Sequence, residues 1–226
     1  MTSNIELVIF DCDGVVIDSE ILSAHVLIQM LSKLKINIDI HYVQQYFLGC
    51  NFKTVSEKIT SAFGVELPDQ FEHDYRQALV AMFADHLQPT AGIKNILLNL
   101  NVPFCIATSS SLQRTQKALH AVQLDALFAD VFTSEEVRFG KPAPDLFLHA
   151  ASVMGVSPQN CLVIEDSSAG IQAGYSAGMQ VLHYFGGQHL ETGVNHVHIN
   201  FPDVALLEHW QSFFIAYPEL KRKSLL

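Results

Sequence analysis

Short apolar segments that alternate with longer helical patterns constrain the fold of this chain more than any other feature. Five of them are of strand length and rich in Val, Ile or Phe: Ile5–Phe10, Pro103–Thr108, Val131–Ser134, Cys161–Glu165 and Met179–Phe185. They lack a clean alternation of polar and apolar residues, which is typical of strands buried on both faces of a parallel sheet. Helical patterns lie at Ile93–Leu100, Leu112–Val122, Pro144–Met154 and Ser168–Ala177. This arrangement predicts an α/β fold with a doubly wound parallel sheet.

The interval after the first predicted strand departs from this alternation. From about Ser19 to His86 the sequence contains amphipathic helical stretches and no strand-like run. Apolar residues recur at every fourth position in three series, which are Leu22, Val26, Met30 and Leu34, then Val55, Ile59 and Phe63, then Tyr75, Leu79 and Phe83. Turn signals lie at Gly49, Gly64, Pro68 and Pro89. We therefore expect residues 18–87 to form an inserted helical subdomain, and residues 1–17 and 88–226 to form the α/β core.

The charge and hydrophobicity of the chain exclude several classes of protein. Its 226 residues include 13 Lys and Arg against 23 Asp and Glu, a formal net charge of −10, and 49% are hydrophobic. So much apolar material excludes intrinsic disorder. So few cations make the chain a poor binder of nucleic acid or of anionic membranes, and we expect neither as a partner.

Targeting signals and cysteine usage predict a cytoplasmic protein. The first ten residues contain Glu6 and no Lys or Arg, so they lack the charged start of a secretory signal. No segment approaches the roughly 18–20 apolar residues that span a bilayer. The cysteines are scattered, at Cys12, Cys50, Cys105 and Cys161. Three of them lie in or beside apolar runs, which indicates reduced buried thiols and makes a structural zinc site improbable.

Acidic residues follow two of the predicted strands. Asp11-Cys12-Asp13-Gly14 comes directly after the first strand, and Glu165-Asp166 comes at the end of the fourth. In an open parallel sheet, ligands bind outside the carboxyl ends of the strands, so these acids would face one crevice. Asp-x-Asp-Gly taken alone fits a turn or a helix cap equally well. Carboxylates that face one another repel unless a cation lies between them, and Mg²⁺ suits such a place because it takes oxygen ligands and bridges to phosphate.

Hydroxyl groups and one lysine follow two other predicted strands. Thr108-Ser109-Ser110-Ser111 precedes a helix, where hydroxyls and free backbone N–H groups form an anion site, although a serine run is also an ordinary helix cap. Lys141 lies in Gly140-Lys141-Pro142-Ala143-Pro144, where the prolines restrict the backbone. No Lys or Arg lies between Lys141 and Lys221, which makes this lysine conspicuous.

Four segments, in order along the chain, resemble the motifs of the haloacid dehalogenase superfamily: IELVIFDCDGVVIDSE, IATSSS, FGKPAPDLF and LVIEDSSAGIQAGYSAGM. The resemblance is to its β-phosphoglucomutase-like branch, and it is strongest to the sugar-phosphate phosphatases there, including the 6-phosphogluconate phosphatase type. It implies a Rossmann-like core, a small α-helical cap formed by the insertion, and hydrolysis of a phosphate monoester. Asp13 argues against dehalogenation, because the dehalogenases of the superfamily lack an aspartate two residues after the nucleophile.

The resemblance also implies a role for each site residue. Asp11 is expected to be the nucleophile that takes the phosphoryl group as an aspartyl-phosphate. Asp13 is expected to protonate the leaving alcohol and then to activate water. Thr108 is expected to bind the phosphoryl oxygens, with help from the backbone of Ser109, and Lys141 is expected to offset the charge of phosphate and nucleophile.

A Mg²⁺ cofactor and a small phosphorylated metabolite follow from the same resemblance. The expected metal ligands are the Asp11 side chain, the Asp13 backbone carbonyl and Asp166, with Glu165 either a further ligand or a partner of the ligands. The substrate class is a sugar or sugar-acid phosphate, with 6-phosphogluconate a candidate. The resemblance gives no oligomeric state, and we expect a monomer.

Two positions depart from the pattern of the mutases in this branch. Those mutases carry a histidine five residues beyond the aspartate that matches Asp18, where this chain has Ser23. They also carry an arginine three residues beyond the cap glycine, and counting from Gly49 gives Phe52. Both departures favour hydrolysis. A hexose-phosphate mutase stays open as the alternative enzyme, and a binding protein on the same scaffold as the non-enzymatic alternative.

Overall fold

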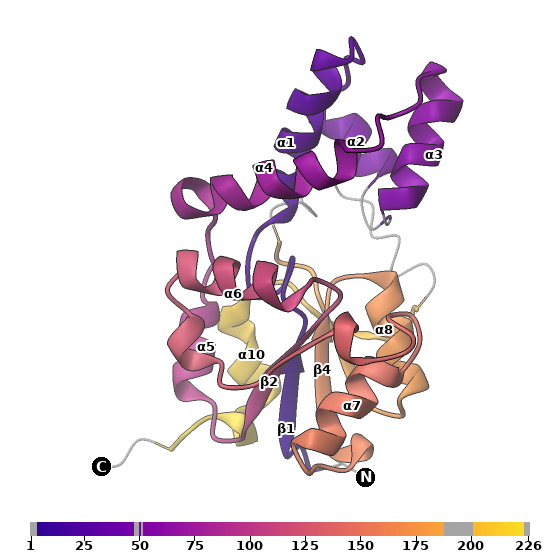
Figure 1. The fold of residues 1–226 in the computed structure, drawn as a ribbon. Coiled ribbons are helices and arrows are strands. Elements are labelled where there is room, and N and C mark those ends of the chain that lie inside the picture. Colours follow the sequence, from indigo (N-terminus) through magenta and orange to yellow (C-terminus); the bar gives the residue numbers. More distant parts are fainter. Residues whose placement is uncertain (1–3, 48–49, 51, 188–200, 224–226) are drawn as a thin grey trace. The chain divides into compact units, whose positions relative to one another are not determined.

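The apolar segments of the sequence form a six-stranded sheet in the computed structural model of the chain (Figure 1). The spatial order is β3-β2-β1-β4-β5-β6, and each neighbouring pair is parallel. The strands are β1 (Leu7–Phe10), β2 (Phe104–Thr108), β3 (Val131–Thr133), β4 (Cys161–Glu165), β5 (Gln180–Tyr184) and β6 (Ala205–Leu207). The predicted α/β fold is confirmed, and the first five strands were predicted to within two residues at each end. Strand β6 was not predicted.

The structure describes residues 4–47, 50, 52–187 and 201–223. The predicted turn at Gly49 lies outside these residues. The chain divides into two units, one made of Met1–Asp18 and Gln88–Leu226 and the other made of Ser19–Leu87.

Helices cover both faces of the sheet, and the alternation of side chains along β1 explains how. Leu7 and Ile9 point to one face, where they share a buried cluster with α7 (Asp145–Val153) and α8 (Ser168–Ser176). Phe10 points to the opposite face, where its ring contacts the ring of Trp210 near α10 (Phe213–Ala216). Figure 1 shows α7 and α8 on one side of β1 and α10 on the other. This two-sided covering explains why the strands carry apolar residues at successive positions.

The remaining helices of the first unit lie between the strands or follow β6. They are α5 (Ile93–Asn99), α6 (Leu112–Ala121) and the 3-10 helices η1 (Asp125–Leu127), η2 (Ser134–Glu136), η3 (Pro158–Asn160), η5 (Trp210–Ser212) and η6 (Pro218–Leu220). Within the described ranges, no helix is both long enough and apolar enough to cross a membrane. The cytoplasmic location stays a prediction.

The second unit consists of helices around a buried apolar cluster that includes Leu27, Leu31 and Ile59. The helices are α1 (Glu20–Lys33), α2 (Ile40–Tyr46), α3 (Phe52–Phe63) and α4 (Phe71–His86). Several of the apolar residues that recur at every fourth position in the sequence are buried in α1, α3 and α4: Leu22 and Val26, Val55 and Ile59, and Leu79 and Phe83. Ser23, at the position where the mutases carry histidine, shares a hydrogen bond between its hydroxyl and the Tyr75 hydroxyl of α4.

Candidate active site

The carboxyl ends of β1, β2 and β4 meet at one edge of the sheet. Phe10, the last residue of β1, lies beside Ile106 of β2 and Ile164 of β4. Asp11 follows directly, and its backbone N–H donates to the Ile164 carbonyl at 2.9 Å. The parallel pairing therefore places Asp11 between the ends of two neighbouring strands, as the sequence predicted for a ligand-binding edge.

A tight turn follows Asp11. Gly14 has a φ of +84°, a backbone conformation that glycine adopts at little cost. The N–H groups of Val16 and Ile17 both donate to the Cys12 carbonyl, at 2.9 and 3.0 Å. The chain thus turns sharply immediately after the two acids.

Lys141 joins three strand ends through one ammonium group. Its Nζ lies 2.5 Å from Asp11 Oδ1 and 2.6 Å from Glu165 Oε1, and it also donates to the Ala107 carbonyl at 2.9 Å. The Lys141 side chain is only 3% exposed. Burial alone would lower the pKa of this lysine, but the carboxylates of Asp11 and Glu165 raise it. The structure thus brings together Lys141, Asp11 and Glu165, each of which the sequence singled out.

Glu165 is held at both of its carboxylate oxygens. Oε1 accepts from Lys141, while Oε2 accepts from the backbone N–H groups of Asp166 and Ser167, both at 3.0 Å, and from Ser167 Oγ at 2.9 Å. A Cβ atom at Gly170 would lie 1.8 Å from Glu165 Oε1, so α8 approaches the carboxylate where it lacks a side chain. The glutamate side chain is 1% exposed and therefore fixed.

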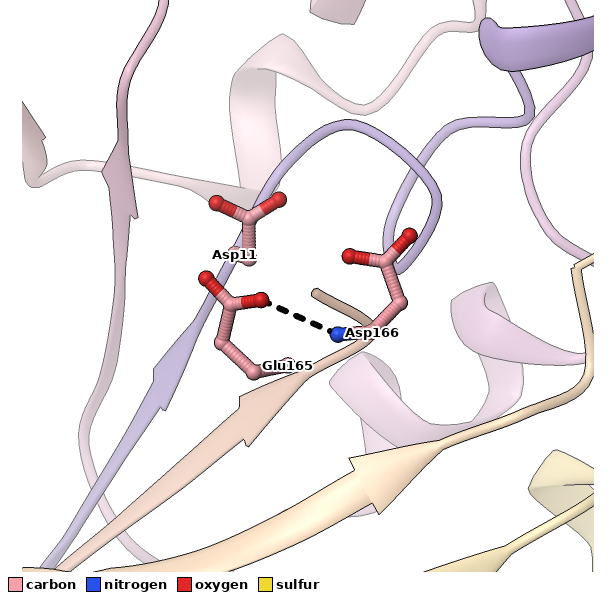
Figure 2. A group of neighbouring side chains, drawn as sticks. All are labelled: Asp11, Glu165 and Asp166. Atoms are coloured by element: carbon pink, nitrogen blue, oxygen red, sulfur yellow. Dashed lines mark hydrogen bonds between the residues drawn. The ribbon is translucent and has the colours of Figure 1, made fainter. Parts of the chain in front are cut away.

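Three carboxyl groups lie beside one another at the ends of β1 and β4, as Figure 2 shows for Asp11, Glu165 and Asp166. One oxygen from each lies within 4.8 Å of the others. Burial raises the pKa of Asp11 well above its usual range, Lys141 lowers it, and Glu165, Asp166 and Asp13 raise it further. Burial also raises the pKa of Asp166, and Glu165 adds to that increase. The single buried ammonium therefore does not balance the acids.

This donor set fits a small divalent cation. Carboxylate oxygens are the ligands that Mg²⁺ takes in proteins, and a cation beside them would counter the effect of burial and of neighbouring negative charge, both of which raise the pKa values of Asp11 and Asp166. Among the described residues, the acidic, histidine or cysteine side chains that lie close enough together to hold a metal are those of Asp11, Glu165 and Asp166.

Asp13 has different partners from Asp11. Arg114 of α6 donates from Nη1 to Asp13 Oδ2 at 2.7 Å and from Nη2 to Oδ1 at 2.8 Å. Ser110 Oγ donates to Oδ2 at 2.8 Å and also hydrogen bonds to Arg114 Nη1. The two aspartates, two residues apart, are thus bound by separate cations.

The residues predicted to bind phosphate lie at the end of β2. Thr108 is buried, and its Oγ1 accepts from the backbone N–H of Ser110 at 3.1 Å. Ser109 is exposed, and its carbonyl accepts from Ser134 Oγ at 2.9 Å. The Ala107 carbonyl just before them binds Lys141. The roles of Thr108 and Ser109 stay predictions.

Comparison with known families identifies the class of protein. Residues 5–178 match the family described as hydrolase, haloacid dehalogenase-like hydrolase. The chain belongs to this family. The family resemblance seen in the sequence is confirmed, and the chain is a hydrolase of the haloacid dehalogenase-like group.

Three relatives of this haloacid dehalogenase-like hydrolase align with between 57% and 96% of its length. It is 30% identical to the 6-phosphogluconate phosphatase of Escherichia coli (strain K12) over 189 residues, 83% of this chain and 86% of that one. It is 35% identical to the beta-phosphoglucomutase of Bacillus subtilis (strain 168) over 129 residues, 57% of this chain and 56% of that one. A haloacid dehalogenase-like protein of unknown function from Agrobacterium tumefaciens str. C58 has the same fold, with a TM-score of 0.87, 28% identity, and coverage of 96% of this chain and 99% of that one.

Sequence reasoning missed two side chains that bind a predicted site residue. Arg114 received no role, and Ser110 was seen only as part of a hydroxyl run. The sequence does contain one indication that Arg114 has an acidic partner. Arg114 lies in the first turn of a predicted helix, where the helix dipole disfavours a cation unless an anion is near. The sequence alone could not name Asp13 as that anion, because the two are 101 positions apart.

Proposed function

We propose that this chain is a Mg²⁺-dependent phosphatase that hydrolyses a small sugar phosphate or sugar-acid phosphate. The observation that carries the proposal is the buried contact of Lys141 with Asp11, beside the further carboxylates of Glu165 and Asp166. Phosphoryl transfer requires chiefly positioning and charge stabilisation, and this cluster offers a fixed nucleophile, a fixed cation and oxygen donors for a metal. Membership of the hydrolase family supports the proposal.

Asp11 acts as the nucleophile in this proposal. One of its oxygens attacks phosphorus, the bond from phosphorus to the substrate oxygen breaks, and an aspartyl-phosphate forms. A water molecule then attacks phosphorus, the bond to Asp11 breaks, and inorganic phosphate leaves. Lys141, 2.5 Å from Asp11 Oδ1, fixes the orientation of the nucleophile and offsets negative charge on the phosphoryl group.

Asp13 moves the proton in both steps. It gives a proton to the departing substrate oxygen, which leaves as an alcohol, and it then accepts a proton from the attacking water. Thr108 donates to the phosphoryl oxygens from its hydroxyl, and Ser109 contributes its backbone N–H. These two residues follow the Ala107 carbonyl that binds Lys141, which supports their place beside the phosphoryl group.

Asp11, Asp166 and the Asp13 backbone carbonyl would hold the metal. Bound Mg²⁺ would offset the negative charge of the carboxylates and of the phosphoryl group. Glu165 orients Lys141 and the backbone of Asp166. One of its oxygens accepts from Lys141, and the other accepts three hydrogen bonds from Asp166 and Ser167. These contacts favour Glu165 as a partner of the metal ligands over Glu165 as a metal ligand itself.

The substrate class follows from the relatives and from the second unit. Similarity to a 6-phosphogluconate phosphatase makes 6-phosphogluconate the first candidate. We propose that residues 18–87 act as a cap that selects the substrate. A hexose-phosphate mutase is the alternative, and similarity to a beta-phosphoglucomutase keeps it in view. The Ser23 hydroxyl, hydrogen-bonded to Tyr75 where the mutases carry an imidazole, favours hydrolysis.

A panel of sugar phosphates that includes 6-phosphogluconate and β-glucose 1-phosphate tests the proposal. We expect inorganic phosphate to be released from one or more of them with Mg²⁺ present, and activity to be lost in Asp11→Asn. Full activity with Ca²⁺ in place of Mg²⁺ would contradict the metal site, because Ca²⁺ takes more ligands at longer distances. An isomerised sugar phosphate formed without release of phosphate would establish the mutase. Unchanged activity in Asp11→Asn would remove Asp11 from the mechanism.

A further inference from the structure

Arg114 binds the Asp13 carboxylate through paired hydrogen bonds. Each carboxylate oxygen receives its own N–H group, at 2.7 and 2.8 Å, and Ser110 adds a third hydrogen bond at 2.8 Å. A guanidinium that binds both oxygens fixes the plane of a carboxylate as well as its position, which a lysine cannot do. The contact therefore fixes the orientation of the Asp13 carboxylate plane.

The surroundings of Arg114 limit its freedom to move. Its side chain is 16% exposed and that of Asp13 is 17% exposed, so the pair is largely shielded from solvent. Arg114 lies on the first turn of α6, where its backbone N–H donates to Ser111 Oγ, the cap of the helix, at 3.4 Å. The helix start that fixes its backbone is also the segment that supplies Ser110.

The location of Arg114 carries an electrostatic cost. A cation in the first turn of a helix opposes the helix dipole, which favours anions there. The Asp13 carboxylate supplies that anion from a different strand end, β1, 101 positions away in the sequence. Arg114 and Asp13 therefore depend on each other, and an ordinary surface arginine would not need such a partner.

We propose that Arg114 is a positioning residue for Asp13, with Ser110 as its second support. The inference rests on the proposed function, in which Asp13 transfers protons. Arg114 acts through the plane and position of the Asp13 carboxylate, which it binds at both oxygens. Displacing a reacting group by about 1 Å can cost about 100-fold in rate, so loss of this support should slow the steps that use Asp13.

The choice of substrate separates this role from a general structural one. An alkyl phosphate, such as the best sugar phosphate of the panel, needs a proton on its leaving oxygen, whereas p-nitrophenyl phosphate releases a stable phenolate without one. The value of kcat/KM reports the steps up to departure of the alcohol. We expect Arg114→Gln to lower kcat/KM by about 10- to 100-fold for the sugar phosphate and by less than about 3-fold for p-nitrophenyl phosphate, since a general acid contributes about 100-fold or more.

A double-mutant cycle gives the second readout. Asp13→Asn removes the group that Arg114 serves, so Arg114→Gln should cost little further activity towards the sugar phosphate in the Asp13→Asn background. Arg114→Lys, which keeps the charge but not the paired geometry, should lie between the wild type and Arg114→Gln. Lys117→Gln removes an exposed cation from the same helix and is the matched control, expected to behave as the wild type.

The outcomes are distinguishable. Equal losses for both substrates, or additive losses in the cycle, would overturn the positioning role. A wild-type chain that releases no phosphate from any substrate would instead overturn the proposed function, whatever Arg114 does. Thermal unfolding of each variant shows whether it folds. If Arg114→Gln does not fold, Arg114→Lys carries the same comparison of substrates, and activity equal to the wild type in that variant would also reject the inference.

Discussion

Lys141 Nζ lies 2.5 Å from Asp11 Oδ1, and both side chains are at least nine-tenths buried. The lysine reaches the aspartate from the loop that follows β3 and η2, and it also contacts the ends of β2 and β4 through Ala107 and Glu165. One ammonium thus connects three neighbouring strand ends. The same contacts that fix the nucleophile also hold the edge of the sheet together, so stability and activity depend on the same side chain.

Replacing Lys141 with Gln should lower both stability and activity. The substitution leaves Asp11 and Glu165 buried beside each other without their cation, and breaking a buried ion pair by removing one partner costs about 3–5 kcal/mol. Urea unfolding measures the stability, and phosphate release measures the activity. Lys94→Gln, an exposed lysine on α5, is the control. Equal midpoints for Lys141→Gln and Lys94→Gln would show that the buried pair contributes nothing to folding.

Asp166→Asn should stabilise the metal-free protein at neutral pH while abolishing Mg²⁺-dependent activity. Burial, with the Glu165 carboxylate beside it, raises the pKa of Asp166 in the folded chain. A carboxyl with a raised folded pKa favours folding below its unfolded pKa of 3.8, and that contribution is lost as the pH rises through the folded value. At neutral pH the wild type therefore carries a penalty that Asn lacks.

Thermal unfolding without metal at a series of pH values checks this prediction. We expect Asp166→Asn to raise Tm by more than about 2 °C at pH 8, with a gain that shrinks as the pH falls. Adding Mg²⁺ should raise Tm of the wild type by linkage and leave the variant nearly unchanged. A gain independent of pH, or equal responses to Mg²⁺, would contradict this account of Asp166.

The features that could be predicted from the sequence are those with a local signal. The runs that form β1 and β4 are apolar at successive positions because helices bury both faces; Asp11 directly follows β1, and β4 ends in Glu165. Strand β6 differs from these runs, because it is only three residues long and only Leu207 of the three is buried. A three-residue strand at the sheet edge is defined by its pairing with β5, which no local pattern contains.

In the candidate site, too, the features with a local sequence signal could be predicted and the contacts between distant segments could not. Lys141 could be singled out because its motif is rigid and no other cation follows for many residues. The pairing of Arg114 with Asp13 joins the start of α6 to the turn after β1, two segments 101 positions apart, and no local pattern indicates it. Glu165 could be placed at the strand end, but the three hydrogen bonds at its Oε2 arise from the backbone turn that follows.

Gly170→Ala should destabilise the protein, although alanine is the better helix former. In an ordinary helix the change stabilises by about 0.5–1 kcal/mol. Here the new Cβ would lie 1.8 Å from Glu165 Oε1, and that carboxylate is fixed by Lys141 and Ser167. Overpacking of this kind costs about 1–3 kcal/mol.

Urea unfolding and phosphate release should both report the displacement of Glu165. The shorter side chain of Glu165→Asp would relieve part of the overlap, so Gly170→Ala should cost less stability in that background than in the wild type. The wild type, the two single variants and the double variant form the cycle. A stabilising effect of Gly170→Ala in the wild type would show that the carboxylate moves freely.

Thr90→Val should destabilise the first unit through loss of the buried hydrogen bonds of the Thr90 hydroxyl. The Thr90 hydroxyl donates to the Val15 carbonyl at 2.5 Å and accepts from Trp210 Nε1 at 2.9 Å, and Thr90 is 3% exposed. Valine preserves the shape but leaves a buried donor and a buried acceptor unsatisfied, at about 1–3 kcal/mol for each group. Because Trp210 stacks on Tyr184 at 4.5 Å, the indole has little room to find another partner.

The test of Thr90 is a cycle with Trp210→Phe, which removes the indole N–H. Urea unfolding followed by circular dichroism gives the free energy of unfolding for the wild type, the two single variants and the double variant. If the hydrogen bond between Thr90 and Trp210 stabilises the unit, Thr90→Val costs less in the Trp210→Phe background, because no indole donor remains to be left unpaired. The Val15 carbonyl loses its donor in both backgrounds, so that part of the cost cancels. Strictly additive losses would show that the indole contributes through its ring contacts alone.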